Sequence, residues 1–142
     1  MKHEDIPSDF RHCVVEDCIA AGHCLRRFAY EHSSEEDASF WTINPKAAKP
    51  ELGKECPHFL DSAPVRMARG FLKALASVPS ANVNAVRAEI SEAFCQRTYY
   101  TMRRGDRVMT PYEQQIVAAA LARYGARTPI EFDCYYEERL WI

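Results

Sequence analysis

Residues 10–24, FRHCVVEDCIAAGHC, hold three of the six cysteines of the chain, Cys13, Cys18 and Cys24. A fourth, Cys56, opens a Cys-Pro dipeptide further along. Clustered cysteines outside an oxidising compartment more often bind a metal or do redox work than form disulfides. This stretch therefore predicts that a metal ion, and not only a hydrophobic core, organises the first part of the fold.

The spacings C-x4-C-x5-C exclude a single continuous helix as the carrier of the three thiols. On such a helix Cys13 and Cys24 would share a face but lie about 16 Å apart along the axis. Bonds of roughly 2.3 Å between a metal and a thiolate cannot span that separation. If the thiols share a metal, the backbone must fold back within 13–24, with Gly22 as a natural turning point, and a helix then begins at Cys24 and ends near His32.

The preferred interpretation of the four thiols is a closed, tetrahedral zinc site with a structural role. An iron–sulfur cluster on the same residues and a set of unliganded thiols are the two alternatives. Four histidines, His12, His23, His32 and His58, could each replace one thiolate, but we expect them at the surface. The predicted ligands are Cys13, Cys18, Cys24 and Cys56.

The remaining cysteines and the bulk composition indicate an ordinary folded chain. Cys95 and Cys134 stand alone, and we expect both in the core. The 142 residues are 47% hydrophobic and 27% charged, with a net charge of −2. That length suits one domain or one domain with a small module. No apolar run opens the sequence and no window reaches the roughly 18 to 20 apolar residues of a membrane span, so we expect a cytoplasmic protein without a membrane partner.

Helices dominate the predicted C-terminal half. We expect helices over 61–78 and 82–94, then a short helix that ends at Gly105. Thr110 begins another, because a Thr cap, a proline and a glutamate three residues after the cap form a capping box, and this helix ends at Gly125. The last residues allow a short C-terminal strand.

The predicted fold class is therefore mostly α. A metal-stapled, cysteine-rich segment over 1–60 precedes a helical domain over 61–142 with a bundle of about four helices. We expect the two to form one compact unit.

Residues 83–107 resemble a helix-turn-helix, although its turn lacks the usual glycine. Residues 87–127 hold seven Arg and four acids, which permits a basic surface. Arginine can contact phosphates or guanine edges, and hydroxyls add phosphate contacts. The alternative is that the aromatic residues fill the core while the arginines pair with the acidic C-terminal tail. The predicted DNA-contacting residues are Arg97, Thr98, Tyr100, Arg103, Arg104 and Arg107.

The chain resembles a family of small, uncharacterised bacterial proteins that carries a domain-of-unknown-function label. The resemblance lies in Cys13-x4-Cys18-x5-Cys24 followed by Leu-Arg-Arg, in Asn44-Pro45, in Cys56-Pro57-x-Phe59, in Thr98-Tyr-Tyr with Arg103-Arg-Gly, and in Thr110-Pro111. It covers nearly the whole chain. It implies that the four cysteines belong to one shared pattern, and it implies no activity, substrate or partner.

The leading functional hypothesis is a non-enzymatic, metal-stabilised binding protein whose partner is DNA. The alternatives are an iron–sulfur redox or sensing protein, and a protein-interaction module with a purely structural zinc. An enzyme is not expected, because four thiolates close the coordination shell and no catalytic motif or small-molecule site is evident.

Overall fold

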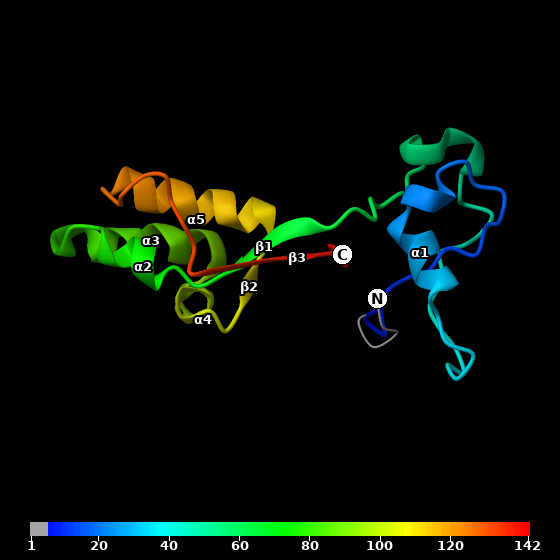
Figure 1. The fold of residues 1–142 in the computed structure, drawn as a ribbon, viewed down its shortest axis with the longest axis horizontal. Helices are drawn as coiled ribbons and strands as arrows, with labels where there is room; N and C mark the ends of the chain where they lie inside the picture. Colours follow the sequence, from blue (N-terminus) through cyan, green and yellow to red (C-terminus); the bar gives the residue numbers. More distant parts are fainter. Residues whose placement is uncertain (1–5) are drawn as a thin grey trace. The chain divides into compact units, whose positions relative to one another are not determined.

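The computed structural model describes residues 6–142 and divides the chain into two compact units (Figure 1). Unit 1 comprises the residues up to Pro64 together with Arg139–Ile142, and unit 2 comprises Val65–Glu138. The division falls at 64/65, four residues after the boundary at 60/61 that the sequence predicts. Helix outweighs strand, as predicted, and among residues 6–142 no helix combines the length and apolar character needed to cross a membrane.

Unit 1 has one α-helix, α1 (Leu25–Glu31), within the part of the chain that the structure describes. A short 3-10 helix, Ala21–His23, turns the chain, and Cys24 follows in an extended conformation as the N-cap of α1. No helix runs through 13–20. The fold-back within 13–24 and the helix that begins after Cys24 are thereby confirmed.

A small core supports α1. Phe10, Leu25 and Ala29 are its buried members. The last residues of the chain complete it, because the Trp141 ring meets Phe10 edge-on with centroids 4.9 Å apart. The guanidinium of Arg139 lies 4.2 Å from the centroid of the Phe28 ring. A second 3-10 helix, Pro50–Glu55, leads into Cys56.

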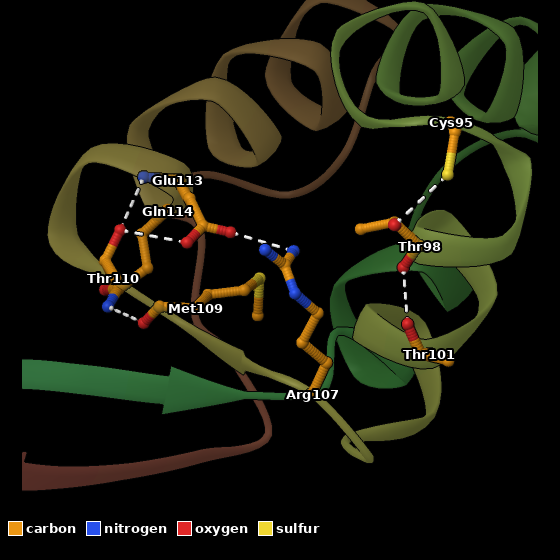
Figure 2. A network of polar contacts seen from close by, with 8 residues as sticks. All are labelled: Cys95, Thr98, Thr101, Arg107, Met109, Thr110, Glu113 and Gln114. Atoms are coloured by element: carbon orange, nitrogen blue, oxygen red, sulfur yellow. Dashed lines mark hydrogen bonds and ion pairs between the residues drawn. The ribbon is translucent and has the colours of Figure 1, made fainter. Parts of the chain in front are cut away.

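Unit 2 contains four α-helices, which matches the predicted number. They are α2 (Leu72–Ala76), α3 (Val83–Phe94), α4 (Gln96–Arg104) and α5 (Pro111–Arg123). The predicted cap of α5 is confirmed: the Glu113 backbone N–H donates to Thr110 Oγ1 at 3.4 Å, and the Thr110 hydroxyl donates to the Glu113 carboxylate at 3.2 Å (Figure 2).

Three antiparallel strands complete unit 2 in the order β2-β1-β3. They are β1 (Val65–Arg69), β2 (Val108–Met109) and β3 (Cys134–Glu138). Five residue pairs join β1 to β3, from Val65 opposite Glu138 to Arg69 opposite Cys134, and the two strands lie side by side in Figure 1. The C-terminal strand is confirmed.

The predicted helix over 61–78 is wrong in its first part. Its apolar spacing fits a helix, but Val65–Arg69 instead pairs with β3, which satisfies its backbone through partners distant in sequence. Gly70 then adopts φ +75°, and α2 begins two residues later. The Asp133 carboxylate caps α2 by accepting from the backbone N–H groups of Leu72 and Lys73 at 2.8 and 3.1 Å. Helix and strand boundaries here therefore depend on contacts between the two ends of unit 2.

The core of unit 2 lies between these helices and the sheet. Its fully buried large side chains include Phe71, Val86, Ile90, Tyr99, Met102, Met109, Val117 and Leu121.

Candidate metal centre

The four predicted ligands come together around one small cavity in unit 1. Cys13, Cys18, Cys24 and Cys56 all line it, and its volume is about 20 Å³. A space of this size holds about one water-sized group. Cys13 and Cys24 are buried, whereas Cys18 and Cys56 are half-buried, and all four are free thiols. The cavity therefore brings together thiols that are up to 43 positions apart in the sequence.

The segment that leads into Cys56 packs closely against the backbone next to Cys18. The Ile19 N–H lies 3.5 Å from the Pro50 carbonyl oxygen. Gly53 follows with φ +58° and ψ −121°, and a Cβ at this position would lie 2.9 Å from Cγ1 of Ile19. Only glycine adopts this conformation and permits this approach without strain.

Cys24 is fixed to the segment that follows Cys56. It forms an isolated antiparallel bridge with Asp61. On either side of the bridge, the Leu25 N–H donates to the Leu60 carbonyl at 2.6 Å and the Ser62 N–H donates to the His23 carbonyl at 2.9 Å. This pairing holds the start of α1 beside the chain that carries the fourth thiol.

The cavity disfavours an isolated negative charge on Cys13. Burial is the main cause that raises the pKa of this thiol, and the nearby Cys24 and Cys18 raise it further by repulsion. The backbone N–H of Val15 and the charge of Arg27 lower the pKa and partly offset these effects. A cation in the cavity would reverse this balance, because it would attract each of the neighbouring thiolates.

The sulfur of Cys56 also receives a backbone donor. The Lys49 N–H lies 3.5 Å from its Sγ.

The thiols do not yet meet at one point. Within residues 6–142, no group of three or more His, Cys, Asp or Glu side chains has the geometry to hold a metal ion. Coordination would require the sulfurs to move inward.

Of the four histidines, His58 lies at this site and His12 lies buried elsewhere in unit 1. His58 lines the cavity with the cysteines. His12 is buried, with 5% of its surface exposed, so its expected surface position is wrong. Its Nδ1 lies 3.0 Å from the Phe10 carbonyl oxygen and 3.1 Å from that of Trp41, and it links the N-terminal arm to the extended residues 40–43.

Several of the predicted DNA-contacting residues in and just after α4 interact with other residues of unit 2. Arg107 pairs with Glu113 at 2.9 Å (Figure 2), and Arg104 pairs with Asp106 at 2.9 Å. Their partners are therefore local acids and not those of the C-terminal tail. The guanidinium of Arg103 lies 4.8 Å from the centroid of the Tyr100 ring.

The rest of α4 divides between core and surface. The alternative interpretation placed Tyr99, Tyr100 and Met102 in the core. Tyr99 and Met102 are fully buried, whereas Tyr100 is half-buried. Thr98 lies with its hydroxyl 3.2 Å from the sulfur of Cys95 (Figure 2). Arg97 is exposed.

Cys95 and Cys134 are both exposed, so the expectation that they lie in the core is wrong. Cys95 forms the one-residue turn between α3 and α4, and Cys134 is the first residue of the edge strand β3. Cys95 has φ +105° and ψ 161°, a conformation that glycine normally occupies. The Thr98 hydroxyl and nearby backbone N–H groups lower the pKa of its thiol.

Comparison with known proteins identifies a family for the chain but no relative of known activity. A family model described as "Family of unknown function (DUF6078)" matches residues 1–141. No curated protein and no solved structure matches the chain.

Proposed function

The chain belongs to DUF6078, a family of unknown function, and we propose that it is a non-enzymatic binding protein whose unit 1 is stabilised by a single zinc ion. The observation that carries the proposal is the one small cavity that all four cysteines line. The zinc ligands are Cys13, Cys18, Cys24 and Cys56. Four thiolates leave no open position on the ion, so its role is structural and its binding energy is folding energy.

Four thiolates suit either a single zinc ion or an iron–sulfur cluster, and metal analysis distinguishes the two. The sulfurs close around zinc by moving inward, with bonds of about 2.3 Å.

Metal analysis of the purified full-length chain tests this proposal. We expect one zinc per chain and no visible colour. Cys56→Ser should lose the zinc together with the cooperative unfolding of unit 1, whereas Cys134→Ser should keep both, because Cys134 is an exposed cysteine in unit 2. A brown protein with stoichiometric iron would instead support the cluster, and zinc retained by Cys56→Ser would refute this ligand set.

DNA binding through α3 and α4 is the second candidate function. The two helices are joined by the single residue Cys95. Arg97 and Arg104 of α4 and Arg107 after it are exposed, while Tyr99 and Met102 of α4 are buried. Unit 2 holds ten Lys/Arg and eight Asp/Glu, so it carries a small positive charge. Phosphates would compete with Asp106 and Glu113 for two of these arginines.

A gel-shift titration with random duplex DNA at several salt concentrations tests the second candidate. Binding should weaken as salt rises, because phosphate contacts release counterions. The double variant Arg97→Gln/Arg104→Gln should weaken binding further, whereas Lys46→Gln in unit 1 should not. Binding that ignores both salt and the arginine changes would exclude this role for α4.

A further inference from the structure

We infer that Arg26 and Arg27 are positioning residues of the metal centre, which hold the cysteine-bearing segments together by hydrogen bonds to their backbone carbonyls. The inference rests on the proposed zinc site and concerns residues that are not ligands. Both arginines lie in the first turn of α1, directly after Cys24 and Leu25. From there they reach the segments that carry the other three thiols.

Arg26 joins the segment that carries Cys56 to the segment that carries Cys13. Its Nε donates to the carbonyl of His58 at 2.9 Å, two residues after Cys56. One terminal nitrogen of the same guanidinium donates to the carbonyl of Arg11 at 2.9 Å, two residues before Cys13. The backbone of Arg26 adds a third link, because its own carbonyl accepts from the Cys13 N–H at 3.0 Å. A single side chain on α1 thus fixes both segments beside the cavity that it also lines.

Arg27 holds the loop between Cys13 and Cys18. Its terminal nitrogen donates to the Val15 carbonyl at 3.1 Å. The side chain is itself restrained, because its Nε pairs with Glu31 at 3.1 Å, and only 14% of the side chain is exposed. Arg27 therefore fixes the peptide two residues after Cys13.

These hydrogen bonds reduce the conformational entropy that is lost when the four thiols converge on a metal. Residues 10–20 and 56–61 contain no α-helix, so without restraint their conformational freedom opposes the convergence of four thiols. Arginine satisfies two carbonyls at once with one planar fork and adds a positive charge beside the thiolates. Lysine supplies the positive charge but cannot bond both carbonyls with one planar group. An Arg→Lys change therefore separates the contribution of the charge from that of the two hydrogen bonds.

Zinc affinity, measured by competition with a chromophoric chelator on the full chain, tests the inference. Arg26→Gln should weaken affinity about 10- to 100-fold, the range seen when groups that support metal ligands are removed. Arg26→Lys should remain nearly as weak, because it cannot bridge both carbonyls. Arg11→Gln is the matched control: the Arg11 side chain is exposed and only its carbonyl is used here, so affinity should stay within about twofold of the parent.

Cobalt(II) titration supplies a readout that a general loss of structure would not produce. Arg26→Gln should reach the same tetrathiolate spectrum as the parent at higher cobalt concentration, because the ligands are unchanged. If Arg26→Gln does not fold even with excess metal, Arg27→Gln decides, since it removes the link to Val15 together with the pair to Glu31, and it should weaken zinc binding by a smaller factor.

The outcomes separate the two proposals. A parent chain that binds no zinc would refute the proposed function. A parent that binds zinc while Arg26→Gln and Arg27→Gln bind it equally tightly would refute only the positioning role. Full affinity in Arg26→Lys would show that charge, and not the bridge between arms, supports the site.

Discussion

Gly53→Ala should strongly destabilise unit 1, although it adds only one methyl group. Gly53 has φ +58° and ψ −121°, where a residue with a Cβ costs about 1 to 3 kcal/mol. The added Cβ would also lie 2.9 Å from Cγ1 and 3.0 Å from Cδ1 of Ile19, and overpacking of this kind costs about 1 to 3 kcal/mol more. We therefore expect a total loss of about 2 to 6 kcal/mol, a large part of the stability of a small unit.

Urea unfolding followed by tryptophan fluorescence measures this loss, because both tryptophans, Trp41 and Trp141, belong to unit 1. Gly22→Ala is the matched control: no atom lies within 4 Å of a Cβ there, and the backbone conformation suits any residue, so stability should be unchanged or slightly higher. Adding Ile19→Ala to Gly53→Ala should recover the steric part and leave the backbone part. If Gly53→Ala unfolds at the same urea concentration as Gly22→Ala, the account of how the two arms pack is wrong.

Three further predictions concern unit 2. Thr110→Ala should cost about 1 kcal/mol in thermal unfolding followed by circular dichroism, because it removes the cap that binds the Glu113 N–H, whereas Thr110→Ser should cost little; equal losses would show that the cap is not the cause. Cys95→Gly should stabilise unit 2 by about 1 kcal/mol by relieving the strain at φ +105°, and Cys95→Ala should bring no such gain; a gain in both would exclude backbone strain as the reason. At neutral pH iodoacetamide should label Cys95 faster than Cys134, which is also exposed, as followed by mass spectrometry, because the Thr98 hydroxyl and backbone donors lower the Cys95 pKa and raise its thiolate fraction; faster labelling of Cys134 would contradict this.

The sequence predicted those elements that depend on residues close together in the chain. The start of α5 follows from Thr110, Pro111 and Glu113, which act within one turn of each other. The turn before α1 followed from the spacing of the cysteines, because no single helix could bring them together. Both features needed only residues that are near in sequence.

Features that depend on distant partners were not predictable in the same way. The helical spacing of residues 65–75 concealed β1, whose partner β3 lies about 65 residues further along. The bonds of Arg26 to the carbonyls of Arg11 and His58 leave no pattern of residue types, because any residue offers a carbonyl. The pair Arg26-Arg27 after Leu25 is part of the family resemblance, but the sequence did not predict its hydrogen bonds to distant backbone carbonyls.

The division of the chain also sets an order of events during synthesis. Unit 2 is a continuous segment, Val65–Glu138, whereas unit 1 is completed by residues 139–142. Trp141 and Arg139, which contact the rings of Phe10 and Phe28, are synthesised after the whole of unit 2. Unit 1 therefore cannot complete its core until unit 2 has been synthesised, whereas unit 2 can fold before that. A metal that binds the N-terminal cysteines during this interval would hold the unfinished unit together until its last residues arrive.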